Sequence, residues 1–279
     1  MTTCALRIGL TRGLIELRQS FTNGAELFSH LLWPLLTLGA LWFLRDAEFG
    51  STGLLLGTLA LPGILGMNAS FGMVSMSQLL TADREDGTLL RAKATPHGMT
   101  GYLVGKVLSV SGGLLADLAI LLVPALFLID GLDLGAEAWL GLAGVVLLGM
   151  VATLPIGAIL GSVFTSARAQ GLIQLPVLGM IAISGIFYPV TALPEWLQWI
   201  AQVFPLYWLG LGMRSALLPY DAMAVEIGES WRHLEMVGVL GAWAVFGLLV
   251  APVVLRRMAR RESGSRIAAR RERALQKIG

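Results

Sequence analysis

The side chains best able to form ion pairs are concentrated in one charged segment, from Thr81 to Pro96, between two long apolar stretches. Its charged side chains are Asp83, Arg84, Glu85, Asp86, Arg91 and Lys93. Acids and bases in such a run can form ion pairs with a groove on a soluble protein, and such pairs fix the identity and orientation of a partner more than its affinity. We therefore predict a docking segment here. The alternative is a solvated loop that only sets the topology of the chain.

Sequence motifs for catalysis are absent from the chain. Residues 101–107 (GYLVGKV) resemble a phosphate-binding loop, but the spacing is one residue short, and a valine stands where a hydroxyl would hold magnesium. The three histidines, His30, His97 and His233, are far apart in the sequence, and the single Cys4 excludes an internal disulfide and a cysteine-based metal site. We expect no enzymatic activity, no metal site and no cofactor in this chain.

Polar residues also lie inside the apolar stretches, with Asn68, Ser70 and Ser75 in one and Asp117 in another. An ionisable group in hydrocarbon is costly and by default indicates function, so we predict that these four line a possible substrate path. The alternative for Asp117 is a hydrogen-bonded contact between helices. Eleven residues of helix place Asp117 about 16 Å from Lys106, which argues against an ion pair between them.

The amino-acid composition predicts that the segments carrying these residues are membrane-spanning helices. The chain is 56% hydrophobic and 14% charged, and its mean hydropathy is +0.74. The apolar runs approach or exceed the ~20 residues needed to cross a bilayer, whereas buried strands of a soluble protein would be only about 4–8 residues long. We predict an all-α integral membrane protein with six spans, near Ala25–Leu44, Gly53–Leu80, Leu103–Ile129, Ala138–Phe164, Gly171–Pro189 and Met236–Leu255. Small residues in the second span predict close helix packing, namely Gly63, Gly66, Ala69 and Gly72.

The first residues and the last residues flank this bundle. Leu6, Leu10, Leu14 and Leu17 recur at helical spacing, which predicts an amphipathic interfacial helix; an ordinary lead-in to the first span is the alternative. The basic tail is a topology anchor, or a lipid or partner contact, and nothing in it supports nucleic-acid binding. We predict one domain over residues 1–279, divided into an interfacial helix (1–24), a six-span bundle (25–255) and a basic tail (256–279).

The distribution of cations predicts the orientation in the membrane. Of the 20 Lys and Arg residues, all but Arg45, Arg214 and Arg232 fall on the side that carries the charged segment. Because positive charge favours the cytoplasmic side, we predict a multi-pass protein with both termini and the charged segment in the cytoplasm.

Two separated motifs resemble the signatures of ABC-2 type exporter permeases, in particular the short drug-resistance permeases. The first motif runs Arg84-Glu85-Asp86-Gly87-Thr88-Leu89, Ala94-Thr95-Pro96 and Gly105-Lys106, and the second runs Ser184-Gly185-Ile186-Phe187-Tyr188-Pro189, Leu193-Pro194-Glu195-Trp196-Leu197, Phe204-Pro205-Leu206 and Arg214. The chain departs from the family pattern at Leu90, where an acid is common, and at His97-Gly98, where bulkier residues are usual.

The resemblance implies roles for both motifs. The first forms a cytoplasmic coupling helix that docks on an ATPase subunit, through Arg84, Glu85, Asp86, Gly87, Thr88 and Pro96. The second forms re-entrant half-helices that close the outer end of the substrate route, with Pro189, Pro194, Trp196, Pro205 and Arg214 as the outer gate. The alternative for this outer segment is a lipid-facing anchor.

Elementary chemistry adds expectations for the outer segment. Pro194 and Pro205 suit the starts of two short helices, because proline is tolerated in a first helical turn. Trp196 and Trp208, like Trp199, suit the headgroup level of the membrane. Arg214 would be costly if unpaired in hydrocarbon and should face an acid, a carbonyl or water.

The resemblance also implies a function. The chain would be the permease subunit of an ATP-driven exporter in a bacterial plasma membrane, moving a hydrophobic or amphiphilic cargo, first a drug or antibiotic and second a lipid or glycolipid. Its partners would be an ATPase subunit that holds ATP and Mg²⁺, a second permease copy, identical or related, and membrane lipids, with no nucleic acid. The alternatives are a secondary transporter or channel driven by an ion gradient, and a membrane scaffold without transport.

Overall fold

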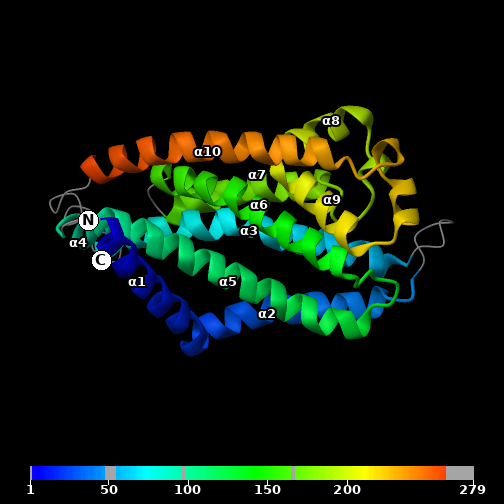
Figure 1. Cartoon of the computed structure of the whole chain (residues 1–279), viewed down its shortest axis with the longest axis horizontal. Coiled ribbons are helices and arrows are strands. Elements are labelled where there is room, and N and C mark those ends of the chain that lie inside the picture. The colour runs from blue at the N-terminus through cyan, green and yellow to red at the C-terminus, as the bar shows by residue number, and fades with distance from the viewer. Residues whose placement is uncertain (1, 48–54, 96–97, 165–166, 262–279) are drawn as a thin grey trace, which may run out of the picture.

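The computed structural model describes residues 2–47, 55–95, 98–164 and 167–261, and this part of the chain is a bundle of helices without a β-strand (Figure 1). The α-helices are α1 (Thr2–Thr22), α2 (Gly24–Leu44), α3 (Leu56–Glu85), α4 (Thr88–Lys93), α5 (Gly98–Leu128), α6 (Ala136–Val163), α7 (Ala167–Ile183), α8 (Glu195–Val203), α9 (Pro205–Leu217) and α10 (His233–Arg261). Short 3-10 helices occur at Val190–Ala192, Tyr220–Val225 and Ile227–Glu229.

Five described helices are long and apolar enough to cross a membrane: α2, α3, α5, α6 and α10. The fifth predicted span, Gly171–Pro189, is not confirmed as a full span. Helix α7 has 17 residues and ends at Ile183, so it is about 25 Å long, short of the ~30 Å of hydrocarbon. The chain leaves the helix there because Gly185 adopts a left-handed conformation, with φ of 68°.

Helix α3 occupies the centre of the bundle. Of its most apolar window, 78% is buried, against 22% for α10. It packs along α6 and α9, and a Cβ built on Gly66 would lie 2.6 Å from the backbone nitrogen of Gly210 in α9. The backbones therefore touch where the sequence places glycine, which confirms the close packing predicted for this span.

Helix α1 packs along the first half of α5 through glycines on both helices. A Cβ on Gly9 or on Gly13 would lie 2.7 Å from the carbonyl oxygen of Gly101 or Gly105, respectively. Thus the face that α1 buries in the protein consists of small residues. The predicted leucine stripe lies beside that face, with Leu6, Leu10 and Leu14 exposed.

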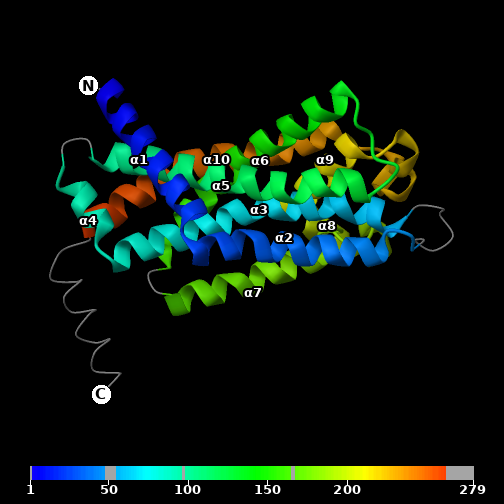
Figure 2. The same cartoon turned by 90° about the horizontal axis from the view of Figure 1, so that it is seen from below.

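The bundle has two distinct ends (Figure 2). At the α4 end, α3 finishes, α4 follows, and α5 begins, with the last turns of α10 nearby. At the α8 end lie α8, the C-terminal end of α9 and the 3-10 helices.

Candidate functional site

The predicted docking segment forms a sharp turn followed by α4. Gly87 has φ of 82°, a left-handed conformation that a Cβ disfavours, and so it ends α3 and redirects the chain. The Asp86 carboxylate accepts a hydrogen bond of 2.7 Å from the backbone N–H of Thr88 and thereby fixes the first turn of α4. On α4 itself, the side chains of Leu89 and Ala92 are buried. A short helix is thus anchored by its apolar side, and its polar side faces outward.

The predicted docking residues divide between surface and interior. Glu85 and Asp86 are exposed, and Gly87 and Thr88 are half-buried. Arg84 differs: its side chain is buried, and it donates hydrogen bonds to the carbonyl oxygens of Gly161 (3.4 Å) and Ser162 (3.2 Å). Pro96 lies outside the described residues.

Arg84 therefore caps another helix instead of projecting from the surface. Its two carbonyl acceptors belong to the last turn of α6, where the unsatisfied carbonyl groups carry partial negative charge. The guanidinium ties the end of α3, immediately before α4, to α6.

A buried lysine connects three helices directly behind α4. Lys106 in α5 is only 3% exposed, and its Nζ lies 2.9 Å from a carboxylate oxygen of Glu16 in α1 and 2.8 Å from one of Asp83 in α3. The Tyr102 hydroxyl donates a hydrogen bond of 2.6 Å to the same oxygen of Asp83. Arg12 lies 2.9 Å from Glu16 and 4.9 Å from the centre of the Tyr102 ring. We call these five residues the α4-end network.

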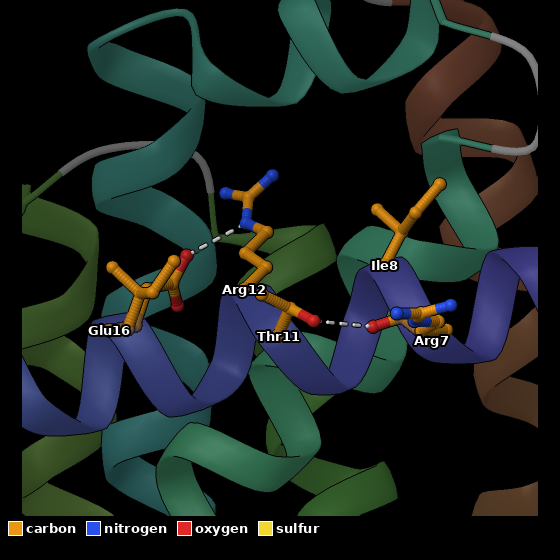
Figure 3. Close-up of a pocket in the computed structure, with 6 residues that line it drawn as sticks. Arg7, Ile8, Thr11, Arg12 and Glu16 are labelled. Carbon is orange, nitrogen blue, oxygen red and sulfur yellow. Dashed lines mark hydrogen bonds and ion pairs between the residues drawn. The ribbon is translucent and has the colours of Figure 1, made fainter.

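The network lies beside an open groove along α1 (Figure 3). The groove has a volume of about 530 Å³ and is lined by Arg7, Ile8, Thr11, Arg12, Ile15 and Glu16. Burial alone would raise the pKa of Glu16, but hydrogen bonds from Arg12 and Lys106 together with their charges outweigh it, and the pKa is lower than the usual 4.5. Glu16 therefore carries its charge at neutral pH.

The sequence indicated Lys106 through a motif and through its rejected pairing with Asp117, and it did not indicate Glu16, Asp83 or Tyr102 as its partners. One signal was available, because Glu16 is the only acid in the first 25 residues. Apart from Arg12, the other members of the α4-end network are 67 to 90 residues away from Glu16 in the sequence, so its role could not be inferred from spacing.

The four residues predicted to line a substrate path occupy different surroundings. Ser70 is buried, and its hydroxyl donates to the carbonyl of Gly66 one turn earlier. Asn68 is half-buried, and its side-chain amide donates a hydrogen bond to the carbonyl of Ile64 one turn earlier. Ser75 is exposed. The structure does not bring Asp117 to these α3 residues.

Asp117 instead belongs to a series of hydrogen-bonded side chains that connects α5, α2 and α1. Its carboxylate lies 2.5 Å from Nδ1 of His30 in α2, and Nε2 of His30 lies 2.8 Å from the hydroxyl of Ser20 in α1. The ring of Phe21 stacks on His30. This arrangement corresponds to the alternative considered for Asp117, a contact that holds the α1–α2 junction against α5.

One face of α3 remains exposed towards the α4 end. It carries both polar and apolar side chains, all half-buried or exposed: Asn68, Phe71, Ser75, Gln78 and Leu79. These positions share one helical face because their spacing follows the period of 3.6 residues. Helices α2 and α7 each contact α3.

At the α8 end, an arginine and a glutamate form a buried ion pair. Nε of Arg214 lies 2.6 Å from a carboxylate oxygen of Glu226, and a second guanidinium nitrogen donates a 3.0 Å hydrogen bond to the carbonyl of Gly185. Both side chains are at least 96% buried. The expectation that Arg214 faces an acid or a carbonyl is confirmed, since it faces both. We call Arg214 and Glu226 the α8-end pair.

The α8-end pair is incompletely bonded. Nη2 of Arg214 and Oε2 of Glu226 are buried and have no hydrogen-bond partner among the described residues. An adjoining cavity of about 10 Å³ is lined in part by both side chains and by Pro189. The structure is therefore closed at this end around the pair.

Helices α8 and α9 form a hairpin whose turn, at the exposed Val203, lies beside α10. Pro194 precedes α8 and Pro205 is the first residue of α9, which confirms the predicted helix starts. The indole of Trp243, ten residues into α10, donates a 2.8 Å hydrogen bond to the carbonyl of Val203 at the hairpin turn. The turn thus lies about 15 Å along α10 from its start.

The tryptophans of this hairpin divide between its two helices. Trp196 and Trp199 are exposed, at 63% and 65%, as a headgroup position requires. Trp208 is 2% exposed, and its indole donates a 2.7 Å hydrogen bond to the carbonyl of Gln202. The prediction of a headgroup position is wrong for Trp208, because α9 is enclosed by α3 and α6.

Comparison with known proteins agrees with the two motifs. A family model described as ABC-2 type transporter matches residues 6–218, which include α4, the α4-end network and Arg214. No curated protein matches the chain. Among the described residues, no cluster of His, Cys, Asp and Glu could hold a metal ion.

Proposed function

The chain belongs to the ABC-2 type transporter family, and from that premise we propose that it is the permease subunit of an ATP-driven exporter in a bacterial plasma membrane. A separate ATPase subunit supplies ATP binding and hydrolysis, with its Mg²⁺. The cargo is hydrophobic or amphiphilic, with a drug- or antibiotic-like molecule as the first choice and a lipid or glycolipid as the second.

The observation that carries this proposal is the construction of α4. Its apolar side, formed by Leu89 and Ala92, is buried. The left-handed Gly87 fixes the direction in which the chain enters α4, and Arg84 connects the end of α3 to α6. Exposed acids at Glu85 and Asp86 stand next to the exposed cations Arg91 and Lys93. A rigid helix with mixed charge on its outer side is suited to receive force from a soluble subunit and to transmit it to α3 and α6.

The charge distribution supports placing the α4 end in the cytoplasm. Most Lys and Arg residues lie at that end or in the segments that adjoin it, and positive charge favours the cytoplasmic side. Both termini would then be cytoplasmic. Residues 1–24 would form the interfacial helix, with Leu6, Leu10 and Leu14 exposed to lipid.

The exposed face of α3 supports a dimer of permeases. Asn68, Ser75 and Gln78 would face hydrocarbon in a lone chain, where uncompensated polar groups are costly. A second copy, identical or related, would cover this face together with α2 and α7. Cargo would then pass between the copies along Asn68 and Ser75. These uncharged polar side chains lie beside the apolar Phe71, and a surface with both characters suits an amphiphilic cargo. Ser70 would act within the helix packing.

The α8-end pair and the α8–α9 hairpin form the proposed outer gate. Arg214 connects α9 to Gly185 after α7 and to Glu226 before α10, so movement of α7 or α10 would break these contacts. Pro189, Pro194 and Pro205 fix the bends of this segment, and the exposed Trp196 anchors it in the headgroups. The hairpin would be re-entrant, since its turn lies about 15 Å along α10 from the start of that helix.

The experiment that tests the proposal compares glycines at the two ends. Gly87→Val forces a β-branched residue to φ of 82°, and Gly228→Val does the same at φ of 68° at the α8 end, where nothing lies within 4 Å. Each variant is purified from its native membrane and assayed for co-purifying ATPase and for ATP-driven export in vesicles.

We expect Gly87→Val to stay in the membrane but lose most of the ATPase, and Gly228→Val to retain it. Glu85→Arg should also reduce ATPase capture. Export that continues without ATP and stops when an ion gradient is dissipated would reject the proposal in favour of a gradient-driven transporter.

A further inference from the structure

We propose that Lys106 is a positioning residue that joins α1 to the coupling helix, so that α1, the end of α3 and the start of α5 move as one body with α4. The inference rests on the proposed function for its consequence in transport. Its structural part, a rigid joint, stands independently of which partner drives α4.

The side chain of Lys106 lies between two other helices. Lys106 is 3% exposed and reaches two carboxylates on two different helices, Glu16 at 2.9 Å and Asp83 at 2.8 Å. An ammonium group has three N–H donors, and two of them are directed by these acids. Asp83 lies only four residues before Gly87 in the sequence. The lysine therefore connects α1 with the last turn of α3 that precedes α4.

The α4-end network is complete. Tyr102 donates to Asp83, and Arg12 bonds the second oxygen of Glu16, so both carboxylates have more than one donor. Among the described residues, no buried side-chain polar atom of the α4-end network is without a partner. A fully satisfied polar network rigidifies its members, because each bond constrains the directions of the others.

Among the described residues, polar side chains attach α1 to neighbouring helices at two places along its length, and the α4-end network is the attachment next to α4. Its glycine face allows a close approach to α5 at Gly101 and Gly105, through contacts that contain no charged group. The Ser20–His30–Asp117 chain fixes the far end of α1. The α4-end network supplies the directional contact next to α4, and so α1 follows the coupling helix.

The test removes the charges together, because Lys106→Met alone would leave two buried carboxylates unpaired and could prevent folding. The triple variant Glu16→Gln, Asp83→Asn, Lys106→Met keeps the shape and removes the ion pairs. Arg18→Met, an exposed charge on the same helix, is the matched control.

The readout is a distance between spin labels on α1 and next to α4. Labels are attached to cysteines at the exposed positions Arg7 and Ala94 in a Cys4→Ser chain in lipid vesicles. Without ATPase, we expect a narrow distance distribution for the wild-type background and for Arg18→Met, and a clearly broader one for the triple variant. If the distance distribution of the triple variant were equally narrow, the proposal that the α4-end network holds α1 rigidly to α4 would be rejected.

A second measurement addresses transport and separates this inference from the proposed function. With the ATPase and ATP, the distance between the labels should stay constant in the wild-type background. The triple variant should still capture the ATPase, yet export per ATP hydrolysed should fall about tenfold, within the usual range for coupling between sites. A triple variant that exports normally, or a wild-type distance that changes on ATP addition, would contradict the proposal. Absence of ATP-driven export in every variant would instead reject the proposed function, and the vesicle measurement would still decide the joint.

Discussion

The two ends of the bundle each contain a buried cation, but the two cations are paired differently. At the α4 end, Lys106 meets two acids, and Tyr102 and Arg12 complete the network. At the α8 end, Arg214 meets one acid and one carbonyl, and one nitrogen and one carboxylate oxygen of the pair have no partner among the described residues. The α4-end network is complete and the α8-end pair is not.

This difference indicates which end is built to stay rigid and which to rearrange. A complete polar network holds one geometry, whereas an incompletely bonded buried pair keeps part of its desolvation cost. An alternative arrangement that hydrates Arg214 and Glu226 would recover that cost. The α8 end is therefore easier to open, as the proposed outer gate requires, while the rigid α4 end suits the proposed transmission of motion.

Breaking the α8-end pair should give the largest effect. Glu226→Ala leaves the Arg214 guanidinium buried and without its acid, and loss of one partner of a buried pair typically costs about 3–5 kcal/mol. We expect a lower unfolding temperature of the purified protein in detergent. Glu229→Ala, at an exposed position nearby, should change it little.

A double variant sharpens this prediction. Replacing both members with apolar residues, Arg214→Met with Glu226→Leu, should recover most of the stability, because no buried charge is left unpaired. If Glu226→Ala proved as stable as the unchanged protein, the pair would be hydrated and the comparison between the two ends would fail.

A smaller effect is expected where α1 crosses α5. In Gly13→Ala the new methyl group would lie 2.7 Å from the carbonyl oxygen of Gly105, so α1 must shift, and such overpacking costs about 1–3 kcal/mol. Gly39→Ala in α2 has nothing within 4 Å and should be neutral or slightly stabilising. Cross-linking between cysteines on α1 and α5 measures the shift. Equal cross-linking in both variants would exclude a tight crossing.

The smallest effect is expected from acidification of the α4-end network. Because the pKa of Glu16 is lower in the folded protein than its usual 4.5, its contribution to stability is fully present above about pH 4.5 and is lost as pH falls through the lowered value. The distance distribution between labels at Arg7 and Ala94 should therefore stay narrow from pH 7 to pH 5 and broaden only at lower pH. A Glu16→Gln chain should lack most of this low-pH change, and broadening already at pH 6 would show that another group controls the network.

Several features of the fold and of the candidate site could be predicted because they depend on local sequence. Apolar length identified the five long helices, and Pro194 and Pro205 identified the starts of α8 and α9, since both follow from the backbone and its immediate side chains. The requirement that Arg214 find an acid or a carbonyl follows from the cost of an unpaired charge. Which acid it finds, Glu226, depends on how the loop before α10 folds back.

Other features depended on contacts between distant segments. The sequence predicted a surface role for Arg84, but its position on the face of α3 next to the end of α6 makes it a cap for that helix. Trp208 looked like an interfacial residue, but α9 is enclosed and the indole is buried. Residues 171–189 are apolar enough for a span, yet a left-handed glycine at position 185 ends their helical course early.

The sequence by itself determined that this is a helical membrane protein with a charged turn at one end, because hydropathy and helical period are properties of neighbouring residues. Only the tertiary structure decided the partners of Lys106, since Glu16 and Asp83 lie 90 and 23 residues away and meet it only when α1 and α3 pack against α5. The physical reason is that burial makes an ion pair obligatory but does not select its members. Selection comes from which helix faces touch, and here the glycines of α1 and α5 set that contact.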